Sequence, residues 1–463
     1  MNDRPEVLVR AVDAGDTYLS WRWLDTPDRC AYAVLARDTV ESALAQLDSA
    51  LLAPRDDETN EQAAQRALSG ALTEPTAELR LAQCLTSAVL PDVLRADIAA
   101  RGGVIRLRLT PSRRLSRVPW ELLCLPDGRR LLEVAEIVHE PPAAIHTARS
   151  VSPPEWADVA EHPALLIIDP RTPNGAAAHG LGPVLDPGDR GAFRARVLDY
   201  VTRGRILADD KYRALDARFG RGELAAALRV PRSRLFYYGH VSATVAEPGS
   251  AALHLGDTRD SSWGMAEPLT RPNLGGTVTR APSDHRPLAA IDLLLGTLAG
   301  DADAHRFYGE TAPVPGARLW PMPPRVALIA CEGGADYRCA ETFGLVIAMA
   351  DAGASLITTT RWILPANRAF TTCYPGTDAR PASDLGLRVD AAHESADPIG
   401  ELGAWQREQL DRWCATGDIA ASPLVWASLS HTVASARADS PGPDSAPDRA
   451  RDKEGGGENQ NED

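Results

Sequence analysis

Four short apolar runs stand out in the second half of the chain, with amphipathic segments between them. The runs are ALLIIDP (164–170), LFYYGH (235–240), RVALIAC (325–331) and ASLITTT (354–360). Each run is nearly continuous in apolar residues, which is typical of a strand covered on both faces. The segments with helical spacing lie at 191–202, 223–229 and 340–353. Buried strands that alternate with helices predict a parallel sheet with helices on both sides.

The first part of the chain has a different pattern, in which short alternating segments are combined with longer amphipathic ones. Alternation predicts strands at 6–12, 17–24, 30–36 and 104–110. Helical spacing predicts one helix over 38–54 and a second over 77–101 that breaks near Pro91. The polar stretch 54–76 is expected to begin as a loop.

Proline-rich sequence around residue 150 marks a domain boundary. We expect residues 1–150 to form an N-terminal α+β subdomain, which is either an appended regulatory unit or a degenerate half of the second domain. Residues 151–435 then form the main α/β domain, with a Gly-, Pro- and Asp-rich insertion at about 244–324 that holds a short hairpin near 250–257. A later helix and an edge strand are expected at 398–417 and 424–432. The tail 436–463 has too few apolar residues to offset its ordering entropy and is predicted to be disordered.

Composition narrows the classes of function. The chain has 463 residues, of which 44% are hydrophobic and 24% are charged, and its formal net charge is −14. That acidic balance argues against a general nucleic-acid or anionic-membrane binder. No secretion signal and no apolar window of about 18 to 20 residues is visible, so a cytoplasmic protein without a membrane span is expected.

Seven cysteines are scattered along the chain without any C-x-x-C pair. This spacing argues against a disulfide scaffold and against a four-cysteine zinc site. We therefore expect a reducing compartment, and neither a metal nor a cofactor.

Two of the buried runs end in residues that carry chemistry. LFYYGH ends at His240, and RVALIAC ends at Cys331, just before Gly333 and Gly334. In a parallel sheet both residues would project from the carboxyl edge, where ligands bind in such folds. A thiol is mostly protonated at neutral pH, and a nearby imidazole can accept its proton. The spacing therefore predicts a Cys–His pair, although a core cysteine and a structural histidine are the plainer alternatives.

Backbone groups would complete this site. The N–H groups of Val241 and Cys331 lie in the two strand-end turns and can bind a developing oxyanion. No third side chain that must orient His240 is evident, which leaves a backbone carbonyl as the candidate.

The same residues resemble a known family, the CHAT-domain peptidases, which are bacterial relatives of caspases, separases and gingipains. ALIACEGG is similar to the family's strand followed by A-C-E-T-G, and YYGHVSA is similar to its strand that ends in G-H-G. PWELL (119–123) resembles its N-terminal subdomain, and GLVIAMADAGASLITTTRWILP (344–365) resembles its helix, A-G-A turn and following strand. The similarity covers roughly residues 100 to 435, and the order and spacing of the motifs make the set specific.

The resemblance implies a caspase-like three-layer α/β/α sandwich with a mostly parallel sheet. It implies that Cys331 is the nucleophile, that His240 is the general acid and base, and that the amides of Val241 and Cys331 form the oxyanion hole. Two positions depart from the family pattern. Val241 replaces the usual glycine and can narrow the cleft or tilt the amide, whereas Gly333 replaces a threonine without evident consequence.

Substrate preference stays open at this point. Some relatives cut after a basic residue by using an acid just before the cysteine, but Ile329 and Ala330 stand there. Candidate pocket residues near the strand ends are Asp169, Arg171, Glu332, Asp336 and Arg361. Their charges predict opposite specificities, and an ordinary surface salt bridge is the alternative for each.

The expected function is a cysteine endopeptidase that acts on a protein or peptide substrate. The resemblance implies a regulated bacterial defence or cell-death programme. No tetratricopeptide pattern precedes the domain, so activation is expected to depend on a separate activator or sensor protein. The alternative is a catalytically silent caspase-like scaffold that binds partner proteins.

Overall fold

The computed structural model describes residues 4–52, 55, 58–142, 145, 149–173, 181–243, 249–270, 280–330 and 344–434. Ten strands form one sheet in the order β3-β2-β1-β4-β5-β13-β12-β11-β7-β6. Their bounds are β1 Glu6–Ala14, β2 Asp16–Trp23, β3 Cys30–Leu35, β4 Ile105–Thr110, β5 Ala135–His139, β6 Leu165–Ile168, β7 Arg234–Gly239, β11 Arg325–Ala330, β12 Leu356–Thr360 and β13 Leu429–Val433. Neighbouring strands are parallel except in the pairs β1–β2, β2–β3 and β12–β13. The predicted α/β class with a mostly parallel sheet is therefore confirmed.

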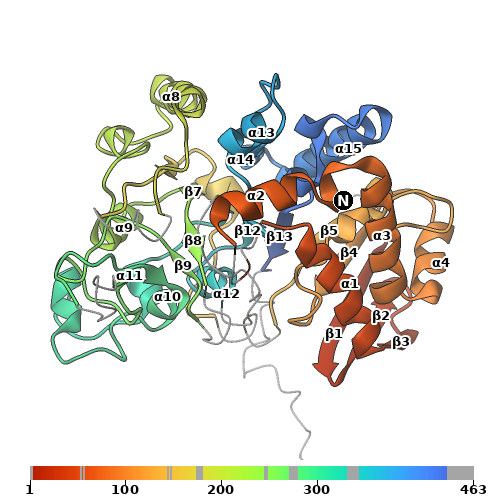
Figure 1. Ribbon diagram of the computed structural model, residues 1–463. Helices are drawn as coiled ribbons and strands as arrows, with labels where there is room; N and C mark the ends of the chain where they lie inside the picture. The colour runs from red at the N-terminus through yellow and green to blue at the C-terminus, as the bar shows by residue number, and fades with distance from the viewer. Residues whose placement is uncertain are drawn as a thin grey trace, which may run out of the picture.

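Helices cover both faces of the sheet in its second half, as the continuous apolar runs predicted. Phe236 and Tyr238 of β7 belong to the core that includes α8 (Pro187–Thr202) and α14 (Pro381–Ala392). The alternate residues Leu235 and Tyr237 belong to a second core with the helices of the opposite layer. These helices are α9 Arg221–Leu228, α10 Ala290–Leu295, α11 Gly316–Leu319 and α12 Leu345–Asp351. Because successive strand residues point to opposite faces, one sheet supplies both cores and three layers result. Figure 1 shows α8 and α14 along the top of the view, and α10, α11 and α12 along the bottom.

The N-terminal strands extend the same sheet. One face of β1, β2 and β4 packs against α1 (Arg37–Ser49) and α3 (Pro75–Val89), which lie in front of these strands in Figure 1. The other face carries exposed apolar side chains such as Val12 and Tyr18 as well as charged ones, and Arg108 of β4 forms ion pairs there with Glu6 and Glu140. The sheet is continuous across residue 150 because His139 of β5 pairs with Thr432 of β13. The division into two domains at that point stays a prediction.

The remaining helices of the described chain connect these strands. They are α2 Asn60–Leu68, α4 Asp92–Ala100, α5 Leu131–Val134, α7 Trp156–Val159, α13 Asn367–Cys373, α15 Pro398–Thr416 and α16 Pro423–Trp426. Helix α2 lies within the polar stretch 54–76 that was expected to begin as a loop, and Thr59 caps it through the amide of Gln62. Across the described residues, none of the helices combines the length and apolar character that a bilayer span requires.

The expected edge strand at 424–432 is wrong in position and extent. The segment begins as α16, and its strand β13 lies inside the sheet between β12 and β5. It is interior because the N-terminal strands supply a parallel neighbour, which the apolar pattern of the segment does not reveal. The stretch 250–257, where a short hairpin was expected, contributes a single strand, β9 (Ala252–Leu253). It pairs with β8 (Val241–Ser242) and β10 (Leu288–Ala289), which lie outside that stretch, in a second sheet of three strands.

Three buried histidines lie close to β12 and β13, with His139 in β5, His431 in β13 and His393 just after α14, and their surroundings keep them neutral. His431 and His393 both contact the hydroxyl of Thr358, at 3.1 and 2.7 Å, and His139 contacts Ser430 at 2.9 Å. Burial lowers the pKa of His431 to about 3, with nearby Arg361 adding to the effect. Burial likewise lowers the pKa of His139 and of His393 well below the usual value.

These histidines predict that stability falls as the pH falls from about 6.5. The unfolded chain binds protons on them below that pH, whereas the folded chain does not, so each contributes a slope of up to about 1.4 kcal/mol per pH unit. Urea unfolding at a series of pH values between 7 and 5 should show a smaller slope for His431→Gln than for the native chain. Gln83→Ala, at an exposed position without a titratable side chain, is the control and should leave the slope unchanged. An unaltered slope in His431→Gln would contradict the argument.

Candidate active site

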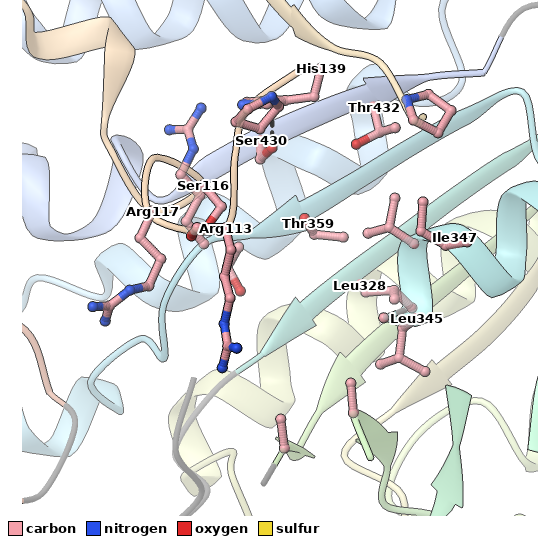
Figure 2. Close-up of a pocket in the computed structure, with 18 of the residues that line it drawn as sticks. Arg113, Ser116, Arg117, His139, Leu328, Leu345, Ile347, Thr359, Ser430 and Thr432 are labelled. Atoms are coloured by element: carbon pink, nitrogen blue, oxygen red, sulfur yellow. Dashed lines mark hydrogen bonds between the residues drawn. The ribbon is translucent and has the colours of Figure 1, made fainter. Parts of the chain in front are cut away.

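A cavity of about 250 Å³ opens where β11 and β12 end and α12 begins. Its wall includes Ala330 at the end of β11, Thr360 at the end of β12, and Val241 and Ser242 just after β7. Figure 2 shows Leu328, Leu345 and Ile347 on one side of this cavity, with the arginine-bearing loop of Arg113 and Arg117 and the ring of His139 on the other. The position agrees with the general rule that α/β sheets bind ligands at the carboxyl ends of their strands.

His240 follows directly after β7, at that edge. The strand is buried throughout, and the histidine itself is 4% exposed. Its Nε2 lies 2.5 Å from the carbonyl oxygen of Gly182. Because a carbonyl only accepts hydrogen bonds, Nε2 must carry the hydrogen, and Nδ1 is the proton acceptor of the neutral ring. A backbone carbonyl thus holds the ring, as the absence of an evident third side chain suggested.

Asp169 anchors the loop that carries Gly182. Its carboxylate accepts hydrogen bonds from the amides of Val184 and Leu185, at 2.8 and 3.2 Å, and lies 3.5 Å from the guanidinium of Arg190. Burial raises the pKa of the Asp169 carboxyl, although these amides, Arg190 and the nearby His240 favour its ionised form. The aspartate was predicted as a substrate-pocket residue, but the contacts of its carboxylate here are with the loop.

The backbone of Val241 is held in a defined orientation by the small sheet. The amide of His254 donates to the carbonyl of His240 at 3.2 Å, and Val241 is paired with Leu253. This register makes the 240/254 pair the hydrogen-bonded one, so the amide of Val241 points away from β9. The side chain of Val241 is buried in the core and lines the cavity.

The two predicted pocket arginines differ in their surroundings. Arg361 lines the cavity, but its guanidinium forms a buried pair with Glu121, at 2.6 and 2.8 Å, and also donates to the carbonyl of Ala427. Arg171 is exposed and forms an ion pair with Asp216 at 3.0 Å. It lines a separate surface hollow beside β6.

Cys331, Glu332 and Asp336 lie outside the described residues. Ala330, which precedes Cys331, is paired with Gly239, which precedes His240. Ala330 and Gly344, the described residues on either side of this gap, both line the cavity.

Sequence reasoning missed Gly182 and Glu121 as parts of this region. Gly182 contributes only a carbonyl and lies 58 residues from its partner, so no side-chain pattern could have identified it. Glu121 carried a usable signal because it lies in the quoted PWELL motif, and a glutamate within an apolar run needs a buried partner.

The described architecture is an α/β protein with a mostly parallel sheet and a cavity at its carboxyl edge. No family model matches the sequence, and no curated protein matches it. Two crystal structures of the separase–securin complex of Saccharomyces cerevisiae, at 3.0 and 2.6 Å, are similar to this chain with TM-scores of 0.42 and 0.44 and identities of 10% and 9%. Each similarity covers 92% of this chain and 30% of the matched chain, so this chain spans about a third of the length of those chains.

Proposed function

We propose that the protein is a cysteine endopeptidase in which Cys331 attacks the substrate carbonyl and His240 transfers the protons. The observation that carries this proposal is the parallel register of β7 and β11, in which Gly239 is paired with Ala330. His240 follows Gly239, and Cys331 follows Ala330. Neighbouring strands lie about 4.8 Å apart, which is within reach of an imidazole–thiol contact.

The geometry of His240 supports its role as the base. Its Nε2 hydrogen is held by the Gly182 carbonyl, so Nδ1 accepts the thiol proton. The thiolate sulfur then bonds to the carbonyl carbon, and the carbonyl oxygen gains negative charge. The imidazolium returns its proton to the leaving amine as the C–N bond breaks, and water hydrolyses the thioester with His240 again acting as base. The amide of Val241, directed away from β9, is a candidate donor to the oxyanion.

The charged side chains that line the described part of the cavity are of both signs and are paired with neighbours. Arg117 is paired with Asp48, Glu140 with Arg108 and Arg361 with Glu121. The opposite specificities that the sequence suggests therefore both stay predictions. A role in a regulated bacterial programme with a separate activator stays a prediction from the family resemblance.

Thiol reactivity tests the proposed pair directly. In the native chain, Cys331 should react with iodoacetamide faster than the exposed Cys30, with a pH midpoint below the ordinary thiol value of about 8.5. His240→Ala should remove this advantage because the thiol loses its proton acceptor, whereas His162→Ala should retain it. The measurement is the alkylation rate of each cysteine, followed by peptide mass spectrometry between pH 5.5 and 9.5. A Cys331 that reacts no faster than Cys30 would favour the silent scaffold.

A further inference from the structure

A chain of three hydrogen-bonded side chains runs from the cavity into the insertion. Ser242, in β8, lines the cavity, and its Oγ lies 2.7 Å from Nε2 of His254. The other nitrogen of that ring, Nδ1, lies 3.0 Å from Nε2 of His285. Nδ1 of His285 in turn lies 2.9 Å from the backbone carbonyl of Asp257. None of these four residues has a part in the mechanism proposed for Cys331 and His240.

The arrangement of these contacts determines where each hydrogen lies. The Asp257 carbonyl can only accept, so Nδ1 of His285 is a donor and its Nε2 is the acceptor of the neutral ring. Nδ1 of His254 must then donate to His285, which leaves Nε2 of His254 as the acceptor for the hydroxyl hydrogen of Ser242. The serine hydroxyl is therefore polarised towards an imidazole, and a second imidazole and a carbonyl hold that imidazole.

Burial and backbone pairing hold the three groups in place. His254 and His285 are 1% and 2% exposed, whereas Ser242 is half-buried at the cavity wall. Ser242 pairs with Ala252 in the small sheet, two residues before His254. An isolated bridge joins His285 to Thr258. A nucleophile, a base and a group that orients the base make up the general arrangement of an activated serine.

We propose that Ser242 is a second nucleophile of the cavity, with His254 as its general base and His285 as the residue that positions this base. The substrate class is acyl donors with a good leaving group, such as activated esters. The proposal goes beyond the cysteine peptidase, because it requires neither Cys331 nor His240.

The proposed reaction is balanced within these residues and water. Oγ of Ser242 bonds to the carbonyl carbon as its proton passes to Nε2 of His254, and the carbonyl π electrons move to the oxygen. When the tetrahedral intermediate collapses, the bond to the leaving alkoxide breaks and His254 returns the proton to it. A water molecule, deprotonated by His254, then attacks the acyl-serine and releases the acid and the free hydroxyl.

A fluorophosphonate probe tests the proposal, because such probes bond covalently to activated serines with loss of fluoride. Peptide mass spectrometry should find the label on Ser242 both in the native chain and in Cys331→Ala, and not in Ser242→Ala. Ser116 is the internal control, since it lines the same cavity but its hydroxyl donates to the carbonyl of Arg113 at 2.7 Å. It should stay unlabelled.

The role of the two histidines is tested by the labelling rate. His254→Gln should slow labelling of Ser242 by about 10²- to 10⁴-fold, the usual contribution of a general base. His285→Gln, which keeps a hydrogen-bonding side chain, should slow it less. If His254→Gln does not fold, the pH dependence of the labelling rate in the native chain provides the test. This rate should rise as one imidazole loses its proton and should stay constant at higher pH.

Two outcomes would overturn the proposal. One is a native chain in which Ser242 is labelled no faster than Ser116. The other is a labelling rate that rises in proportion to hydroxide up to pH 10 without a plateau, as for an unassisted hydroxyl. Because Cys331→Ala should keep the label, failure of the cysteine mechanism and failure of this one can be distinguished.

Discussion

Cys331→Ala and His240→Ala are each expected to lower peptide cleavage by about 10²- to 10⁴-fold or more, since each removes a group that bonds to the substrate or moves its protons. At about 1.4 kcal/mol for each factor of ten, this is about 3 to 6 kcal/mol of transition-state stabilisation. The double variant should be little worse than either single variant, because residues that act as a unit are not additive.

The measurement is a proteome-wide cleavage screen that compares the native chain with Cys331→Ala, followed by kinetics on the peptides it identifies. The screen also reads out specificity, because it shows whether cleavage falls beside acidic or beside basic residues. Cys30→Ala, at an exposed cysteine, is the matched control and should retain full activity. Native-like circular dichroism should accompany the loss of activity in both active-site variants. Equal cleavage by the native chain and Cys331→Ala would exclude the cysteine as the nucleophile.

Breaking the buried pair between Arg361 and Glu121 should destabilise the fold by about 3 to 5 kcal/mol, because a charge without a partner would be left in the interior. The two side chains are 2% and 4% exposed and make two contacts, at 2.6 and 2.8 Å. The backbone amide of Arg361 also donates to the carbonyl of Ser428 at 2.7 Å, which ties the end of β12 to the segment before β13. Glu121→Met and Arg361→Met should therefore both unfold at much lower urea concentrations than the native chain.

A double-mutant cycle isolates the interaction energy between the two side chains from the other effects of each substitution. Glu121→Met combined with Arg361→Met should recover most of the lost stability, since a buried ion pair can often be replaced by apolar side chains. Arg171→Met breaks an exposed pair with Asp216 and should cost no more than about 1 kcal/mol. If the two single variants at the buried pair lose no more stability than Arg171→Met, the ion pair between Arg361 and Glu121 does not stabilise the fold beside the cavity.

Strands and helices with a clear hydrophobic pattern could be predicted from the sequence. The runs at β6, β7, β11 and β12 are apolar enough to be recognised as strands covered on both faces, and all four are found in the parallel part of the sheet. The end of α12 could also be predicted, because a glycine, Gly353, follows the helix. In the structure Gly353 has a φ of +117°, which residues with a side chain rarely adopt. The placement of His240 directly after a buried strand followed from the same pattern.

Contacts between distant segments could not be read in this way. The position of β13 depends on which strand lies beside it, and β5 is nearly 300 residues earlier in the chain (|i−j| = 291 between His139 and Ser430). Glu121 and Arg361 are separated by 240 residues, and neither position alone indicates the charge of its partner. The serine and histidines of the Ser242 chain look like ordinary polar residues of an insertion until the small sheet brings them together.

The sequence by itself determined the four buried strands of the parallel part of the sheet, and that a histidine and a cysteine each follow a buried strand, because hydrophobic periodicity is a local property of the chain. Only the tertiary structure decided that Gly182 holds the histidine ring, that Arg361 is neutralised by Glu121, and that Ser242 lies in contact with His254, which in turn contacts His285. These are hydrogen bonds between groups brought together by sheet order and register, and they depend on the arrangement of the whole sheet.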